Sequence, residues 1–256
     1  MSADLVQCME FRGQRAQPLR NVPIYTAAIV WVQRGEKQLK WRDNSLHFGA
    51  DSWLLVPANQ RLTFINQPDN GQFRSRVLAL LQVPDEGLLQ QKPQPWQQPR
   101  FEPDMALRFG FETVLQAQQK KLSPAVIHHY LQGFYQQLQE AGVLHQLFPA
   151  AQLSLSEQLC RYFAADPAAE HNQLQICQHF GLSKATLTRK LAQESTQFRA
   201  LLADVRMSYA LAVMQGETLS QLELALRCGY QSERRFAERF RAQFGLTPAA
   251  YQRTLE

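Results

Sequence analysis

The sequence has few cysteines and no long apolar run. Its four cysteines are far apart and form no C-x-x-C pair, so we expect reduced packing residues rather than disulfides or zinc ligands. No apolar run approaches the roughly 18 residues that a membrane helix requires. The first residues lack the basic-then-apolar plan of a signal peptide. We therefore expect a cytoplasmic protein with no membrane segment.

The sequence also lacks the motifs of the common enzyme classes. It contains no H-E-x-x-H pair, no glycine run suited to phosphate, and no serine in a nucleophile elbow. Its histidines are scattered, and most lie in stretches that we expect to be helical. We therefore predict no enzyme and no cofactor.

A repeat near the C-terminus is the most informative pattern that is present. The first copy is Gly181-Leu182-Ser183 followed by Leu187 and Leu191, and the second is Gly229-Tyr230-Gln231-Ser232 followed by Phe236 and Phe240. From the serine onward, equivalent residues are 49 positions apart (232 − 183, 236 − 187, 240 − 191). Each copy predicts a short helix, a turn at glycine, and a second helix capped by serine. This is the pattern of a duplicated helix-turn-helix unit.

The stretch between the two copies predicts a connecting helix. Residues 198–214 contain no glycine or proline and carry apolar residues at helical spacing. Two helix-turn-helix units on one spacer resemble the AraC/XylS family of transcriptional regulators. The resemblance covers about residues 153–252. Its motifs are Leu187-Thr-Arg-Lys-Leu191, Glu194-Ser-Thr-Gln-Phe198, Arg206-Met207 with Ala210, Cys228-Gly-Tyr230, Arg235-Phe236, Arg239-Phe240 and Phe244-Gly-Leu-Thr-Pro248 with Tyr251.

Two details refine this resemblance. The form Glu194-x-Thr196-x-Phe198 is similar to the sub-branch of enteric virulence and acid-stress regulators. Gln221 stands where the family usually has a branched aliphatic residue, so Leu219 or Leu222 would have to fill that space. The resemblance implies a regulator that binds promoter DNA, acts more often as an activator than as a repressor, and contacts RNA polymerase.

Packing and the resemblance together select the residues that should contact DNA. If the apolar residues of each second helix face the core, the opposite face is left for DNA. The net charge of +5 and the arginines between positions 227 and 241 favour this interpretation. The predicted DNA-binding residues are Lys184, Ala185, Thr188, Arg189, Ser232, Arg234, Arg235, Ala237 and Glu238. Ala185 and Ala237 offer only methyl contacts, and some relatives carry arginine at the position of Glu238.

The N-terminal 90 residues predict β structure. Runs rich in β-branched and aromatic residues occur at 24–32, 46–48, 52–56, 62–65 and 73–81, and their even spacing is typical of a barrel or sandwich. The segment resembles the cupin-like barrel at the N-terminus of many AraC-type proteins, which can hold an effector. His47 is its only histidine, so we expect no metal. Arg61 is the candidate that would pair with an acidic effector, although a surface position is the alternative.

A connector and two helices should follow the barrel. Residues 90–103 are rich in proline and glutamine, and residues 104–121 and 123–147 show helical patterns. The second pattern contains an apolar stripe, Ile127, Leu131, Phe134 and Leu138. The stripe predicts either packing against the barrel or an antiparallel homodimer interface.

The predicted fold is therefore α+β. Residues 1–148 would form an effector and dimerisation domain, with the barrel at about 1–90 and helices at about 104–147. Residues 149–256 would form an all-α DNA-binding domain with two helix-turn-helix units joined by a long helix. The predicted function is transcriptional regulation controlled by a small organic effector. The alternatives are a ligand-independent regulator controlled by its own abundance or by a protein partner, and a cupin-type enzyme with a DNA-binding appendage. Missing metal ligands argue against the enzyme.

Overall fold

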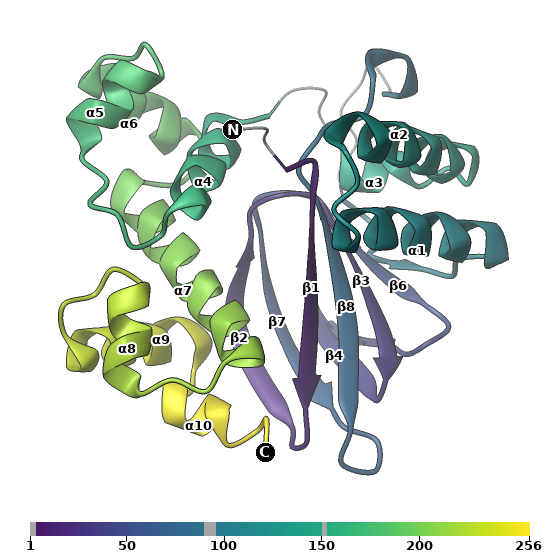
Figure 1. Ribbon diagram of the computed structural model, residues 1–256, viewed down its shortest axis with the longest axis horizontal. Helices are drawn as coiled ribbons and strands as arrows, with labels where there is room; N and C mark the ends of the chain where they lie inside the picture. The colour runs from purple at the N-terminus through teal and green to yellow at the C-terminus, as the bar shows by residue number, and fades with distance from the viewer. Residues whose placement is uncertain (1–3, 90–95, 150–152) are drawn as a thin grey trace.

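The computed structural model describes residues 4–89, 96–149 and 153–256 (Figure 1). Its strands are β1 (Val6–Gly13), β2 (Gln17–Ile24), β3 (Ala28–Arg34), β4 (Glu36–Trp41), β5 (Asn44–Phe48), β6 (Trp53–Val56), β7 (Gln60–Gln67), β8 (Phe73–Leu80) and β9 (Arg100–Phe101). Its helices are the 3₁₀ turn η1 (Glu86–Leu88), then α1 (Met105–Gln119), α2 (Pro124–Glu140), α3 (Leu144–Leu147), α4 (Leu155–Ala165), α5 (Gln173–His179), α6 (Lys184–Gln193), α7 (Phe198–Gly216), α8 (Gln221–Arg227), α9 (Glu233–Phe244) and α10 (Pro248–Gln252). Figure 1 shows the strands in the centre, with α1–α3 on one side and α4–α10 on the other.

The strands form two antiparallel sheets rather than a closed barrel. One sheet has the order β1-β8-β3-β6-β9 and the other β2-β7-β4-β5. The chain crosses between the sheets at Gly35, where φ is +76° and a Cβ would lie 2.5 Å from the Gln67 carbonyl oxygen. Only glycine fits this corner. The expected barrel is therefore corrected to a sandwich whose inner faces pack together.

The predicted strand at 24–32 is two strands in the structure. β2 ends at Ile24 and β3 begins at Ala28, because the chain changes sheets between them. β1 and most of β2 were not predicted as individual strands. Pro18 and Pro23 weaken the strand pattern of β2, but both are tolerated because β2 is an edge strand.

The helices α1 and α2 cover the outer face of the five-stranded sheet (Figure 1). Asp104 and Ser123 cap them, as their side chains accept hydrogen bonds from Leu107 N and Val126 N. The predicted helix at 123–147 is interrupted at Gly142, where φ is +71°. The β9 strand lies inside the predicted connector, of which residues 90–95 are outside the described residues.

The apolar stripe of α2 packs inside the chain. Its members Ile127, Leu131, Phe134 and Leu138 are 5% exposed or less and belong to one core with α1 and with the outer face of the sheet. Side chains that are buried against the sheet cannot also form a surface for a second copy. The apolar stripe therefore packs within the chain, and the alternative of a homodimer interface at these residues is corrected.

The C-terminal helices form two helix-turn-helix units around α7. Ser154 and Glu157 form the capping box that starts α4. The first unit, α5–α6, has a core of its own with α4 and the first half of α7. The second unit, α8–α9, belongs instead to a core that continues into the interior of the sandwich. The predicted boundary at 148–149 stands next to residues 150–152, which lie outside the described residues.

Candidate nucleic-acid interface

The two second helices begin in the same way. Ser183 Oγ accepts a hydrogen bond from Thr186 N at 3.1 Å, and Ser232 Oγ accepts one from Arg235 N at 3.4 Å. A glycine with positive φ precedes each serine, at +61° for Gly181 and +74° for Gly229. These turns set the angle at which each second helix leaves the first.

The buried faces of α6 and α9 determine what they show to solvent. Leu187, Leu191, Phe236 and Phe240 are at most 1% exposed. The opposite faces carry the predicted DNA-binding residues. Of these, Lys184, Ala185, Thr188, Arg189, Arg234, Arg235 and Glu238 are exposed, while Ser232 and Ala237 are half-buried.

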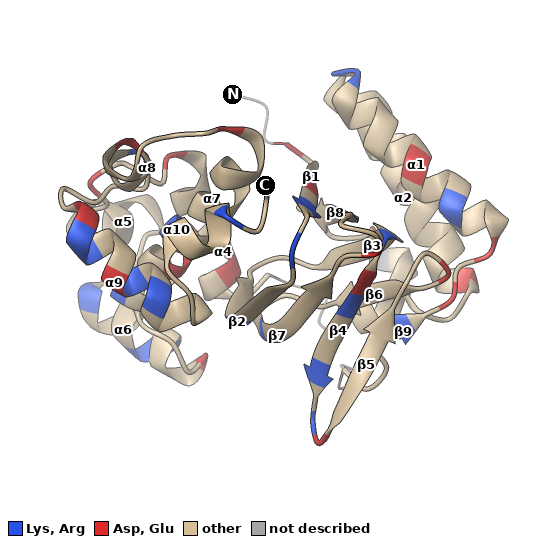
Figure 2. Ribbon diagram, turned by 90° about the horizontal axis from the view of Figure 1, so that it is seen from below, with Lys and Arg blue, Asp and Glu red and all other residues tan. Residues whose placement is uncertain are grey.

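The structure brings the basic residues of both units to one side of the molecule. Figure 2 shows lysine and arginine on both α6 and α9, with the sandwich on the right, and Figure 1 shows α6 near the top and α9 lower down on the same side. The positive surface is therefore shared by two helices that lie far apart in the sequence. A basic surface of this kind attracts a polyanion.

Carboxylates balance part of this charge. Arg234 Nε donates to Glu238 Oε1 at 2.9 Å, and Arg227 Nη1 pairs with Glu217 Oε2 at 2.8 Å. The Glu238 carboxylate raises the pKa of Arg234 through this hydrogen bond. Within the described part of the chain, Lys184 and Arg189 have no carboxylate at ion-pair distance. The first helix thus offers free cations, whereas the second offers a paired one.

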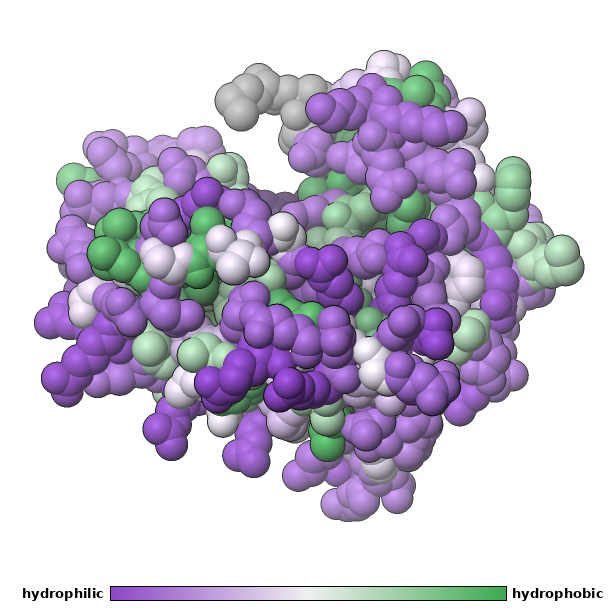
Figure 3. Space-filling view, turned by 60° about the horizontal axis from the view of Figure 1, so that its bottom comes forward, coloured by the Kyte–Doolittle hydropathy of each residue, from purple (hydrophilic) through white to green (hydrophobic). Residues whose placement is uncertain are grey.

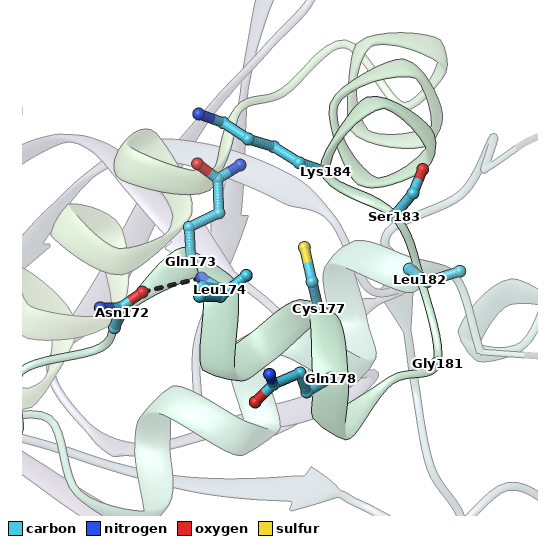
Figure 4. Close-up of a pocket in the computed structure, with 9 residues that line it drawn as sticks. All are labelled: Asn172, Gln173, Leu174, Cys177, Gln178, Gly181, Leu182, Ser183 and Lys184. Carbon is cyan, nitrogen blue, oxygen red and sulfur yellow. Dashed lines mark hydrogen bonds between the residues drawn. The ribbon is translucent and has the colours of Figure 1, made fainter.

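A groove of about 590 Å³ lies between α5 and the start of α6 (Figure 4). Leu174, Cys177 and Leu182 give it an apolar floor, and Lys184 stands at its edge. Asn172 Oδ1 accepts a hydrogen bond from Leu174 N at 2.8 Å and caps α5. The groove is a consequence of the short α5 meeting α6 at an angle.

Arg61 lies at the boundary between the sandwich and the helices. It starts from β7, and its guanidinium pairs with Asp204 of α7. The Arg61 side chain is 49% exposed. The guanidinium is thus directed at a carboxylate of the helical part, and this partner, 143 positions away, was not predicted from the sequence.

A buried lysine inside the sandwich was not among the predicted site residues. Lys37 of β4 is 5% exposed. Its Nζ donates to Asn66 Oδ1 and lies 3.5 Å from the centroid of the Phe64 ring. Burial without a carboxylate partner lowers the pKa of Lys37 to about 7. The sequence of β4 could have revealed it, because side chains alternate between the two faces of a strand. Lys37 is two positions before the buried Leu39 and therefore lies on the same face.

A polar chain leads from this lysine to the C-terminus. Asn66 Nδ2 donates to Gln17 Oε1 at 2.9 Å, and Gln17 Nε2 donates to Thr254 Oγ1 at 3.0 Å. These three residues are buried. The interior of the sandwich and the end of the helical part are therefore joined by hydrogen bonds as well as by the shared core.

Other kinds of site find little support in the described ranges. Residues 4–89, 96–149 and 153–256 contain no group of three histidine, cysteine or acidic side chains placed to hold a metal ion. None of the helices described there is both long and apolar enough to cross a bilayer.

Comparison with known proteins agrees with this geometry. A family described as "Helix-turn-helix domain" matches residues 176–254. The chain is 27% identical over 131 residues to the porin thermoregulatory protein EnvY of Escherichia coli K12, an alignment covering 51% of each chain. It is 29% identical over 115 residues to the transcriptional regulator GadX of the same strain, covering 45% of this chain and 42% of GadX. The chain thus spans about half the length of the curated relatives that it matches.

The whole fold is also known. A solved structure of ToxT from Vibrio cholerae superposes with a TM-score of 0.66 at 14% identity, over 98% of this chain and 99% of ToxT. At this identity the likeness shows the fold alone. The sandwich and both helix-turn-helix units therefore occur together in a solved protein.

Proposed function

This chain carries the helix-turn-helix domain of the AraC/XylS family, and from that premise we propose that it is a sequence-specific DNA-binding transcriptional regulator. The observation that carries the proposal is the placement of α6 and α9. Both helices carry exposed basic residues, and both lie on the side of the sandwich opposite α1 and α2.

The spacer between the units fits B-DNA. α7 has 19 residues, which gives a rod of roughly 28 Å at the usual rise of a helix. Successive major-groove segments on one face of the duplex recur about every 34 Å. We propose that α6 and α9 enter two such segments, with Arg189 and Arg234 contacting bases and Lys184 contacting phosphate.

Selection from a random DNA pool tests this proposal. The full-length protein should enrich duplexes with two conserved blocks one helical turn apart, and a footprint should span both. A footprint of a single turn, or enrichment of one block only, would contradict it. We further propose activation through contact with RNA polymerase, and neither an enzymatic activity nor a cofactor.

The buried Lys37 favours an acidic effector as the regulating signal. An ammonium without a carboxylate in an apolar interior is a ready partner for an organic acid. ToxT has been solved with an unsaturated fatty acid and with (E)-4-(8-methylnaphthalen-1-yl)but-3-enoic acid. We propose that an amphipathic acid binds in the sandwich and pairs with Lys37 rather than with Arg61, whose guanidinium is engaged by Asp204.

Thermal unfolding with added oleate tests the effector. The wild-type protein should be stabilised in proportion to ligand concentration, and Lys37→Met should remove the effect, while the exposed Lys40→Met should keep it. Equal responses of the two variants would favour the alternative, a ligand-independent regulator controlled by its abundance or by a protein partner.

We propose that the N-terminal domain, residues 1–148, self-associates through a different face from the one predicted. On α1, Met105 is 87% exposed and Phe109 72%, and on α2, Val126 is 39% and Tyr130 45% exposed. Figure 3 shows apolar side chains at the right-hand edge of the molecule, on the side where Figure 1 has α1 and α2. We propose a homodimer that uses this outer face of the helical hairpin.

A further inference from the structure

The Asp204 carboxylate is shared by the two halves of the molecule. Asp204 lies in the middle of α7, and its side chain is 3% exposed. A buried carboxylate is costly unless it is paired. Two cations approach it, Arg61 from β7 of the sandwich and Arg239 from α9 of the second helix-turn-helix unit.

The two arginines do not share Asp204 equally. Arg61 pairs closely through Nη2 to Oδ2, and its Nη1 lies 3.5 Å from Oδ1. The nearest approach of Arg239 is longer, at 3.6 Å from Nη2 to Oδ1. In addition, Arg239 Nε is buried and has no hydrogen-bond partner within the described residues. The Arg239 side chain is 40% exposed, but its buried Nε has no partner in the described part of the chain, so its hydrogen bonds are incompletely satisfied.

Because Arg239 belongs to α9, its distance from Asp204 is linked to the position of that helix. In the sequence of α9, Arg239 lies between the exposed Glu238 and the buried Phe240. A movement of its guanidinium towards Asp204 would pull α9 against α7. Such a movement would shift the residues that read the second major-groove segment.

Other contacts place the sandwich against the same unit. The Cδ atom of Arg20 on β2 lies 3.2 Å from where a Cβ of Gly245 would stand, at the C-terminal cap of α9. Gln215 of α7 accepts a hydrogen bond from Arg12 N at 2.9 Å. The second unit also shares the core of the sandwich, whereas the first unit has its own core, against which Tyr25 packs from the N-terminal half.

We propose that Arg61 is a positioning residue for DNA reading by the second helix-turn-helix unit. By holding Asp204, it keeps Arg239 at the longer distance and so fixes α9 relative to α7. Without Arg61, the Arg239 guanidinium closes on Asp204 and α9 moves with it. The inference rests on the proposed reading of DNA by α9, and it makes the N-terminal domain part of the reading apparatus.

Binding to a duplex selected by the wild-type protein tests the proposal. Affinity is measured for that duplex and for copies in which the first or the second block is scrambled. The contribution of each block is the factor by which scrambling it lowers the affinity. Arg61→Met should reduce this factor at least about fivefold for the second block and leave it unchanged for the first. Arg61→Lys should restore part of the loss. The matched control is Arg74→Met, because Arg74 pairs with Glu10 at 2.6 Å within the sandwich and is 51% exposed, against 49% for Arg61.

A double-mutant cycle separates this role from general stability. In an Asp204→Asn background, Arg61→Met should cause no further loss, because the carboxylate for which the arginines compete is already absent. Equal losses on both blocks, a gain on the second block, or behaviour identical to that of Arg74→Met would each overturn the proposal.

A measurement without DNA keeps the test independent of the proposed function. In nitrogen-15 spectra of the full chain, the Arg239 Nε–H should exchange with water several-fold more slowly in Arg61→Met than in wild type, since it gains a carboxylate partner. An unchanged Arg239 signal would overturn the positioning role. If the wild-type protein enriches no DNA sequence, the proposed reading fails, whereas the Arg239 signal still decides whether Arg61 controls the pairing.

Discussion

Arg234 and Glu238 form an ion pair along one turn of α9, with Arg234 Nε 2.9 Å from Glu238 Oε1. The Arg234 side chain is 87% exposed, so solvent screens this pair strongly. To reach a base edge, the guanidinium has to exchange this carboxylate for a guanine. The equivalent surface of α6 carries Arg189 with no such competitor within the described residues. The two units therefore expose different cations, although their backbones repeat.

This difference predicts unequal losses when the arginines are removed. Arg189→Ala should weaken binding to a selected duplex by about 1–3 kcal/mol and relax the preference at one base pair, as expected for an arginine on guanine. Arg234→Ala should cost less than Arg189→Ala, because the wild-type protein already has to break the pair with Glu238. Fluorescence anisotropy on the selected duplex and on single-base variants measures both losses. A greater loss for Arg234→Ala would show that Glu238 does not compete with DNA.

Lys184 should act without sequence preference. It is exposed at the start of α6, where a lysine contacts phosphate as a point charge. Lys184→Ala should weaken all duplexes by a similar factor and lower the slope of log K against log salt concentration by about 1. Titrations at four or more salt concentrations measure the slope, with Lys40→Ala on the sandwich as the control. A change of preference at a single base pair would assign Lys184 to base reading instead.

Lys37 should make the stability of the protein depend on pH. Its pKa is about 7 in the folded chain and near 10.4 when unfolded, so the unfolded state binds more protons between these values. The free energy of unfolding should therefore rise with pH across this window. Below pH 7 the full cost of the buried lysine is present.

Lys37→Met removes this cost and should stabilise the protein more at pH 6 than at pH 9.5, by up to about 3 kcal/mol. Urea unfolding at the two pH values, with Lys40→Met as the exposed control on the same strand, gives the difference. An equal effect of Lys37→Met at both pH values would mean that Lys37 keeps its charge throughout.

The outer face of α1 should control self-association. Phe109→Asp places a charge on a side chain that is 72% exposed, so it should abolish a homodimer and leave the fold intact. Leu131→Asp, at a fully buried position, should instead destabilise the N-terminal domain by about 3–5 kcal/mol, because it buries an unpaired charge. Sedimentation equilibrium and circular dichroism separate the two effects. An unchanged assembly in Phe109→Asp would move the interface elsewhere.

The helix-turn-helix units could be predicted from the sequence because their determinants are local. A capping serine, a glycine with positive φ and apolar residues four positions apart act within about 15 residues, and the structure has each of them in the predicted place. The expectation at Gln221 needed the tertiary structure. Leu219 packs against the core, whereas Leu222 is 50% exposed, so Leu219 fills the space that the sequence left open between the two.

The N-terminal half shows where local patterns stop being sufficient. Evenly spaced runs of β-branched and aromatic residues indicated strands. They did not decide between a closed barrel and two sheets, because that choice depends on which distant strands pair. The stripe from Ile127 to Leu138 was correctly predicted as a buried face of a helix, and only the packing of α1 and the sheet showed what covers it.

The sequence by itself therefore determined the second helix of each helix-turn-helix unit, its capping serine and its outward residues, since these follow from the period of an α-helix. Only the tertiary structure decided the partners of Arg61 and Lys37. Arg61 meets Asp204 from 143 positions away, and Lys37 is buried because β4 faces a second sheet. Neither fact follows from spacing, because long-range pairing is set by the packing of whole elements and not by the residues next to each side chain.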